Sequence, residues 1–301
     1  MKILLLGKTG QIGGALAKRL RTTAEMTEPE RQTLDLADGE AIRRTVADAH
    51  PDLIINAAAY TDVEGAEDDP SKAELINATA PGILAEEAKK CGAALIHFST
   101  DYIFDGTQAT PYDEDAPPEP CNVYGRSKLL GEVAIRETGA AHVVFRSSWI
   151  YDVRGRNFLL TILRLAQREE VLRVVDDQFG APTPATVVAE TVAEIIAQTQ
   201  NRPVEFFKDK GGIINLTCRG CTTWRDFAQS IVDRARRHGM TLSVQEVRGI
   251  PSSEYWGKAA RPKNSRLDLS RLQKRFGLTT PEWEPALDNV FSDFDSLGLM
   301  P

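Results

Sequence analysis

A tyrosine and a lysine, Tyr124 and Lys128, lie four positions apart in the sequence Tyr-Gly-Arg-Ser-Lys. Side chains at positions i and i+4 of a helix share one face, so this phenol and ammonium would be neighbours. A phenol with its ordinary pKa of about 10 exchanges protons poorly at neutral pH, and a nearby positive charge lowers that pKa. The same lysine can hydrogen-bond a cofactor ribose. The pair predicts proton transfer at a substrate oxygen, although this spacing alone is common in helices.

Three glycines, Gly7, Gly10 and Gly13, have the spacing G-x-x-G-x-x-G directly after an apolar run. Glycine allows positive φ in the turn, close approach of the backbone to a pyrophosphate, and tight packing of helix on strand. The helix that follows offers free N–H groups to phosphate. No G-K-[ST] closes this motif, as it would in a P-loop. We therefore expect a dinucleotide cofactor here, with its pyrophosphate at Gly10, Gln11 and Ile12.

The end of the expected second strand lacks the clean aspartate that would hold a ribose 2′-hydroxyl. It has the sequence Glu-Pro-Glu-Arg at 28–31, followed by Leu-Asp-Leu at 34–36. Asp35 and Leu36 can lie along the adenosine, and Arg31 can face a 2′-phosphate or be an exposed loop residue. The pattern predicts that NADPH binds at least as well as NADH, with NADH still possible.

The apolar run at 94–98 continues as Ser-Thr-Asp-Tyr at 99–102. Thr100 therefore lies at the carboxyl end of an expected central strand. The carboxyl ends of strands are where α/β sheets present ligand-binding groups. The glycine turn, Thr100 and the Tyr124–Lys128 pair together indicate a redox enzyme more strongly than any one of them.

The four histidines are scattered without paired metal-ligand spacing, and His97 is expected to be a satisfied core residue.

The elements expected around these residues alternate between apolar strands and amphipathic helices. The run at 2–6 is apolar after Lys2, as in a strand buried on both faces. Strands are expected at 2–6, 53–55, 94–98 and 143–145, and helices at 11–21, 71–90 and 124–137. This alternation predicts an α/β fold with a parallel sheet covered on both faces. Later elements are less regular, with helices near 157–168, 185–198 and 223–237 and strands near 171–175 and 213–217.

The composition is that of an ordinary globular protein, with 301 residues, 42% of them hydrophobic, and a net charge of −7. No apolar run approaches the roughly 20 residues of a membrane span. A basic stripe typical of nucleic-acid binders is missing. The N-terminal run is interrupted at Gly7 and has no cleavage site, so we read it as a strand and expect a cytoplasmic protein. Cys218 and Cys221 have CxxC spacing, but without a second such pair we interpret them as part of a turn.

Seven segments together resemble the dTDP-4-dehydrorhamnose reductases, within the extended short-chain dehydrogenase/reductase superfamily. The similarity spans residues 1 to about 290, and the last two segments are specific to this family. The segments are 7–13, 56–61, 99–106, 122–125, 146–151, 177–183 and 261–267.

The resemblance implies a Rossmann-like doubly wound parallel sheet with a smaller α/β substrate-binding domain built from later segments. The NAD(P)-binding domain would be 1–148, with 185–200 and about 213–217 returning to it. The substrate domain would be 149–184 and 218–301.

The resemblance also implies an activity, the NAD(P)H-dependent reduction of the C4 keto group of dTDP-4-dehydro-L-rhamnose. Tyr124 would protonate the forming alkoxide, with Lys128 and Thr100 as its partners. The remaining residues would be Ala59, Tyr60 and Thr61 beside the nicotinamide, Asp101 and Trp149 on the sugar, and Arg261 and Asn264 at the nucleotide end.

Some bacterial members of the family are described as dimers bridged by Mg²⁺, with one carboxylate two residues after the third glycine. That position is Ala15 in this chain, which has no oxygen to offer. Mg²⁺ prefers hard oxygen ligands, usually including carboxylates. We expect activity without Mg²⁺, and a monomer or a homodimer held by other contacts. Other acidic residues could in principle replace the missing ligand, but we expect them to be solvated residues on helix surfaces. They are Glu190, Asp288, Asp293 and Asp295.

Two other functions remain open from the sequence. A sugar dehydratase or epimerase of the same superfamily is one, but dehydratases carry an acid directly after the Thr-Asp pair, where this chain has Tyr102. The other is a non-catalytic NADP-binding subunit that resembles the regulatory subunit of methionine adenosyltransferase. Intact Thr100, Tyr124 and Lys128 argue against loss of catalysis.

Overall fold

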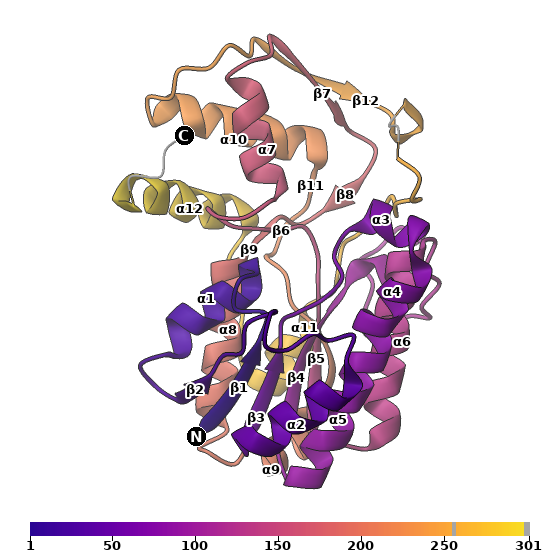
Figure 1. The fold of residues 1–301 in the computed structure, drawn as a ribbon. Helices are drawn as coiled ribbons and strands as arrows, with labels where there is room; N and C mark the ends of the chain where they lie inside the picture. Colours follow the sequence, from indigo (N-terminus) through magenta and orange to yellow (C-terminus); the bar gives the residue numbers. More distant parts are fainter. Residues whose placement is uncertain (255–256, 298–301) are drawn as a thin grey trace.

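Six parallel strands form the central sheet, in the order β10-β5-β4-β3-β1-β2. The computed structural model, which describes residues 1–254 and 257–297, is shown in Figure 1. Strands β1, β3 and β4 carry almost only buried residues, as a sheet covered on both faces requires. The bounds are β1 Lys2–Leu6, β2 Glu25–Thr27, β3 Leu53–Asn56, β4 Ala94–Thr100, β5 His142–Ser147 and β10 Gly212–Asn215.

Helices cover both faces of this sheet, so the predicted doubly wound α/β architecture is confirmed (Figure 1). One core contains α1 (Gln11–Leu20), α8 (Ala185–Gln198), α9 (Pro203–Lys210) and α11 (Ser270–Phe276). The opposite core contains α2 (Gly39–Ala49), α5 (Ala80–Cys91) and α6 (Val123–Thr138). The helix expected at 71–90 is present as α4 (Pro70–Glu74), a π-helical turn η1 (Leu75–Thr79) and α5. A short helix α3 (Val63–Asp68) precedes it.

A second lobe lies at the carboxyl edge of the sheet, shown above it in Figure 1. Its core is built from α7, α10 and α12 around β7 and β12. Two small strand pairs, β6–β9 and β8–β11, complete it. The bounds are α7 Phe158–Ala166, α10 Trp224–Arg237, α12 Trp283–Leu297, β6 Ile150–Tyr151, β7 Val171–Val175, β8 Phe179–Gly180, β9 Thr183–Pro184, β11 Thr222–Thr223 and β12 Glu246–Ile250.

Helix α11 departs from the expected division, which assigned all of 218–301 to the second lobe. Leu272 and Phe276 of α11 are buried in the core of the sheet, beside Ile214 of β10. The reason is local, because β10 is the edge strand of the sheet and α11 packs on it, in the same core as α8. The chain therefore returns to the first lobe once more than the sequence indicated. For the rest of the chain, we propose that the two lobes have the residue ranges expected from the sequence.

A buried ion pair fastens α6 to β5. The guanidinium of Arg146 donates two hydrogen bonds to Glu132, at 3.0 and 2.7 Å, and both side chains are almost fully buried. The Glu114 backbone carbonyl accepts a third bond at 3.2 Å. Because Arg146 precedes the end of β5 and Glu132 lies one turn after Lys128, the pair sets the distance between two walls of the site described below.

Replacing Arg146 by methionine is expected to lower the free energy of unfolding by about 3–5 kcal/mol, because the Glu132 carboxylate would stay buried without its partner. Chemical denaturation measures this change. The matched control is Arg248→Met, which breaks an exposed pair with Glu246 and should leave stability nearly unchanged. An Arg146→Met protein as stable as wild type would show that this ion pair does not hold α6.

Candidate active site

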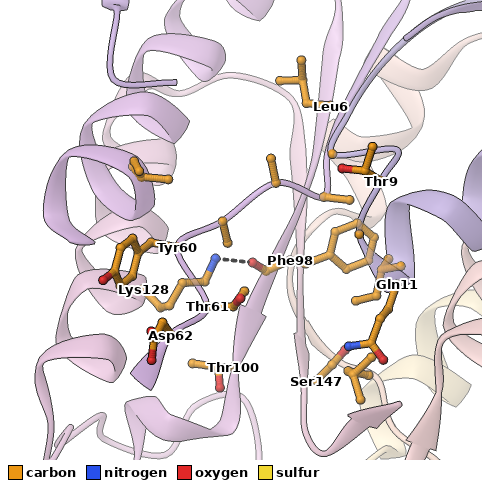
Figure 2. Close-up of a pocket in the computed structure, with 18 of the residues that line it drawn as sticks. Leu6, Thr9, Gln11, Tyr60, Thr61, Asp62, Phe98, Thr100, Lys128 and Ser147 are labelled. Atoms are coloured by element: carbon orange, nitrogen blue, oxygen red, sulfur yellow. Dashed lines mark hydrogen bonds between the residues drawn. The ribbon is translucent and has the colours of Figure 1, made fainter. Parts of the chain in front are cut away.

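A cavity of about 910 Å³ opens at the carboxyl edge of the sheet and takes its walls from both lobes. Figure 2 shows part of its lining, with Gln11, Thr100, Lys128 and Ser147 converging from different elements. Most of the sequence-predicted site residues meet here; three, Gly13, Arg261 and Asn264, do not line it. Those that do are Gly7, Gly10, Gln11, Ile12, Arg31, Asp35, Leu36, Ala59, Tyr60, Thr61, Thr100, Asp101, Tyr124, Lys128 and Trp149.

The glycine turn between β1 and α1 forms one end of the cavity. Gly7 has φ +84°, which favours glycine, and a Cβ at Gly13 would lie 2.0 Å from the carbonyl oxygen of Gly7. Gly10 is the N-cap of α1 and supplies no side-chain cap, and the first turn has no acidic residue. The first N–H groups of α1 therefore lack a side-chain acceptor, as a phosphate-binding helix requires. The turn fits a pyrophosphate.

Two basic side chains line the cavity beside the residues that are expected to face the adenosine. Arg31 lines it, and so does Lys8, which pairs with Glu30 at 3.3 Å. This pairing offsets the carboxylate that would otherwise repel a 2′-phosphate. Lys8 was not singled out in the sequence, because a single lysine in a glycine-rich turn has no distinguishing spacing.

The loop that carries Ala59, Tyr60 and Thr61 is held by a buried asparagine from the π-helical turn. Asn77 accepts a hydrogen bond from the Tyr60 N–H at 2.8 Å and donates one to the Tyr60 carbonyl at 3.0 Å. Its amide also donates to Ser127 of α6 at 2.9 Å. The loop after β3 and the helix that bears Tyr124 are thereby fixed to each other.

Tyr124 is partly buried in the first turn of α6, and Asn122 caps that helix by accepting the Gly125 N–H at 2.7 Å. The Thr100 hydroxyl hydrogen-bonds the phenol. Burial raises the pKa of Tyr124 to about 12, the Asp101 charge acts in the same direction, and the bond from Thr100 opposes both. The phenol is therefore protonated at neutral pH and is poised to donate its proton.

Lys128 is buried on the same helix, but its ammonium points to the sheet. Nζ donates to the Phe98 carbonyl oxygen at 2.6 Å, the dashed line in Figure 2. Burial lowers the pKa of Lys128 to about 8, and the Glu132 carboxylate partly offsets that effect. The sequence predicted that Lys128 lowers the phenol pKa. The structure differs, because the lysine is held on β4 and burial dominates at Tyr124.

Asp101 follows Thr100 and is almost fully buried beside it. Burial raises the pKa of Asp101 to about 7, against hydrogen bonds from Ser265 and Thr100 that lower it. The Thr100 hydroxyl lies 3.1 Å from Asp101 Oδ1.

Five buried side-chain oxygens in the cavity wall lack a hydrogen-bond partner within the described part of the chain. They are Gln11 Oε1, Ser99 Oγ, Asp101 Oδ2, Ser147 Oγ and Ser148 Oγ. A buried polar group without a partner costs about 1–3 kcal/mol, so a cluster of them indicates a polar ligand. Sequence reasoning missed the serines as site residues. Their signal was their place at the carboxyl ends of β4 and β5.

Two stacked tryptophans form an apolar wall of the cavity. The rings of Trp149 and Trp224 have centroids 3.5 Å apart and lie within 11° of parallel. Trp149 has φ +51°, a conformation that costs a non-glycine residue about 1–3 kcal/mol and is concentrated at functional sites. Gly180 makes room for it, since a Cβ there would lie 2.6 Å from the indole. Trp224, at the start of α10, was not predicted from the sequence.

Arg261 and Asn264 brace loops outside the cavity lining. Arg261 pairs with Glu64 at 3.2 Å. The Asn264 amide donates to the carbonyls of Gln108 and Thr110 at 2.7 and 2.9 Å. In this structure both side chains have protein partners. Their contact with the nucleotide stays a prediction.

No group of three or more histidine, cysteine, aspartate or glutamate side chains is placed to hold a metal ion in the ranges 1–254 and 257–297. Ala15 packs against the core of the sheet.

The cysteines are free, and burial raises the pKa of Cys218 to about 12, which disfavours the reactive thiolate. Across the same residues, no helix is long and apolar enough to cross a membrane.

Treatment with EDTA is expected to leave turnover and solution mass unchanged, since Ala15 cannot ligate Mg²⁺. The measurement compares stripped protein with and without added Mg²⁺, by initial rates and light scattering. Activity or a dimer that appears only with Mg²⁺ would show that other carboxylates replace the missing ligand.

The parallel sheet, the glycine turn under α1 and the Tyr–Lys pair on α6 together define a Rossmann-type protein of the extended short-chain dehydrogenase/reductase class. The comparisons with known proteins narrow this class further. Residues 1–296 match the family described as the RmlD substrate binding domain, and the chain belongs to that family.

A dTDP-4-dehydrorhamnose reductase from Burkholderia thailandensis is 43% identical over 290 residues, which cover 95% of this chain and 97% of the relative. The crystal structure of such a reductase from Clostridium acetobutylicum superposes with a TM-score of 0.90 at 31% identity, covering 98% of this chain and 100% of that one. A Bacillus anthracis reductase in complex with NADP has a TM-score of 0.87 at 30% identity, with 97% and 99% covered. The resemblance inferred from the sequence is confirmed.

Proposed function

We propose that the chain is an NADPH-dependent reductase that converts the C4 keto group of dTDP-4-dehydro-L-rhamnose to the hydroxyl of dTDP-L-rhamnose. The observation that carries this proposal is that one cavity holds both the glycine turn under α1 and the Tyr124–Thr100 pair. Relatives that bear the name of this reductase along nearly their whole length support it, as does the related structure with NADP.

The residues of the site fit the reduction of a carbonyl. When bound, NADPH supplies the hydride that reduces the keto carbon. The Tyr124 phenol donates its proton to the substrate oxygen as the carbonyl becomes an alkoxide, and the Thr100 hydroxyl can hydrogen-bond the same oxygen. General-acid assistance of this kind contributes roughly 10²–10⁴ in rate. Lys128, one helical turn after Tyr124, lines the same cavity with its nitrogen held on the Phe98 carbonyl.

The second lobe contributes the sugar-facing wall. The Trp149–Trp224 stack presents an apolar surface, which suits a 6-deoxy sugar with its methyl group and excludes water from the reacting carbon. The unpartnered serine hydroxyls and Asp101 offer hydrogen bonds elsewhere in the lining. A cavity of this polarity fits a nucleotide sugar better than a fully apolar substrate.

The two alternative functions are less well supported. Tyr102 occupies the position of the dehydratase acid, and burial raises its pKa well above the ordinary value, so it is a weaker acid than a carboxyl group. A non-catalytic subunit would not require the protonated phenol and its Thr100 bond to face a cavity. The discriminating experiment is NADPH consumption with and without dTDP-4-dehydro-L-rhamnose. Binding of NADPH without sugar-dependent consumption would favour the regulatory function.

Arg31→Glu is expected to weaken NADPH binding about tenfold or more, roughly 1.4 kcal/mol, while NADH binding changes little. The reversed charge would repel the 2′-phosphate, which NADH lacks. Cofactor fluorescence titration measures both dissociation constants. Arg19→Glu, an exposed change at the end of α1 outside the cavity, is the matched control. An unchanged NADPH affinity in Arg31→Glu would make Arg31 a surface residue only.

A further inference from the structure

A loop of the second lobe reaches the glycine turn of the first. This loop, residues 152–157, connects β6 to α7. A Cβ at Gly155 would lie 3.8 Å from Cγ of Gln11, the first residue of α1. Gly155 and the next residue, Arg156, line the same cavity as Gly10 and Gln11. The loop therefore places an arginine of the second lobe in the wall of the cavity that contains the phosphate-binding turn.

A buried asparagine fixes the backbone of this loop. Asn157 is the N-cap of α7 and accepts the Leu160 N–H at 3.0 Å. Its amide donates to the carbonyl oxygens of Asp152 and Arg154 at 2.7 and 3.1 Å. These three bonds tie the loop to the start of α7, so the second lobe itself holds the backbone on both sides of Arg156.

The guanidinium of Arg156 has no protein partner. The residue is exposed, and its side chain makes no hydrogen bond or ion pair within residues 1–254 and 257–297. Asp152, the acid of the same loop, accepts the Val153 N–H at 2.6 Å and does not line the cavity. A guanidinium stays charged at any pH that the protein meets and recognises phosphate oxygens through two parallel N–H groups. Arg156 is thus available for an anionic ligand in the cavity.

The glycine turn supplies N–H groups for a pyrophosphate but little formal positive charge. Between residues 7 and 14 the only basic side chain is Lys8, and Lys8 is paired with Glu30 at 3.3 Å. The pyrophosphate of a dinucleotide carries one negative charge on each phosphate, and a helix N-terminus offers only a partial positive charge. An unpaired arginine from the facing loop would supply the charge that the turn lacks.

We propose that Arg156 is a binding residue for the pyrophosphate of the dinucleotide cofactor, so that the two lobes hold this group between them. The inference rests on the proposed function, which requires a dinucleotide in this cavity, and it adds a ligand-binding residue from the second lobe. A nucleotide sugar also carries a diphosphate. The contact of the loop with Gln11, one of the residues expected at the cofactor pyrophosphate, favours the cofactor.

The test measures cofactor binding without turnover. Arg156→Ala should raise the dissociation constants of NADPH and NADH alike, each by about tenfold, the loss expected for one charge-assisted hydrogen bond. Both cofactors should respond because both contain the pyrophosphate, whereas Arg31→Glu should affect NADPH alone. Fluorescence titration at low ionic strength, in the absence of sugar nucleotide, measures both constants. The difference from wild type should shrink as salt is added, because salt screens the charge.

Two further variants separate a specific contact from a general effect of charge. Arg154→Ala is the matched control, because it removes the same charge from an exposed residue of the same loop that does not line the cavity. It should leave both dissociation constants nearly unchanged. Arg156→Lys keeps the charge but loses the paired N–H groups, so its affinities should lie between those of wild type and Arg156→Ala. Thermal melting should show that all three variants fold, since neither arginine side chain holds the loop.

Three results would overturn the proposal. Unchanged affinity for both cofactors in Arg156→Ala would remove the contact, and a loss confined to NADPH would assign it to the 2′-phosphate. A parallel titration with dTDP gives the third, because a loss of dTDP affinity with cofactor affinity intact would assign the arginine to the diphosphate of the sugar nucleotide. Failure of the proposed function is distinguishable, because wild-type protein would then bind NADPH without sugar-dependent consumption, whatever the affinities of the Arg156 variants.

Discussion

Tyr124→Phe is expected to lower the turnover number by a factor of about 10² or more while NADPH affinity changes little. The phenol is the protonated group beside Thr100, and its pKa of about 12 keeps the proton available throughout the neutral range. Phenylalanine fills the same space, so the cofactor end of the cavity should remain intact. The loss should therefore appear in kcat and be absent from cofactor binding.

Steady-state kinetics and NADPH fluorescence titration measure the two quantities separately. Tyr112→Phe is the matched control, because Tyr112 is buried and donates to Asp105 at 2.8 Å outside the cavity lining. It should keep its turnover number. A Tyr124→Phe protein with most of its activity would show that another group protonates the alkoxide.

Gly13→Ala should raise the dissociation constant of NADPH by about 100-fold or more, roughly 2.7 kcal/mol. The new Cβ would lie 2.0 Å from the Gly7 carbonyl oxygen and 2.6 Å from its carbon, so the turn or α1 must shift. Both atoms belong to the backbone of the phosphate-binding turn, which cannot move aside as a flexible side chain can. The N–H groups at the start of α1 would then miss the pyrophosphate.

The matched control for this change is Gly14→Ala in the same helix. Its Cβ would lie 3.2 Å from the Lys8 carbonyl, which requires a shift of only a few tenths of an ångström, and alanine favours the helix. Its affinity for NADPH should stay close to that of wild type. Thermal melting of both variants separates a lost cofactor site from a lost fold. Wild-type NADPH affinity in a folded Gly13→Ala protein would contradict the assigned phosphate site.

The parts of the fold that could be predicted from the sequence are those with a strong pattern among neighbouring residues. Runs such as 2–6 and 94–98 are apolar on both faces, which only a covered parallel strand explains, and the glycine turn follows the first of them. The Tyr124–Lys128 spacing likewise depends only on helix geometry. These signals are contained in a few adjacent residues.

The parts that were missed depend on contacts between distant residues. β8, β9 and β11 have two residues each, which is too short for a periodic pattern. Trp224 becomes a cavity residue only because Trp149 of another segment stacks on it. Lys128 donates to the Phe98 carbonyl, and burial is the main cause of the shifted pKa values of Tyr124 and Lys128, neither of which spacing along the sequence reveals.

The most direct test of the proposed function follows a labelled hydrogen. The chain is incubated with NADPH that carries deuterium at C4 of its nicotinamide on the transferred face, together with dTDP-4-dehydro-L-rhamnose, and the sugar nucleotide is analysed by mass spectrometry and NMR. The account predicts dTDP-L-rhamnose with one deuterium at C4 of the sugar, formed by wild-type protein and, at a rate lower by a factor of about 10² or more, by Tyr124→Phe. A sugar nucleotide recovered unreduced, or reduced without deuterium at C4, would contradict it.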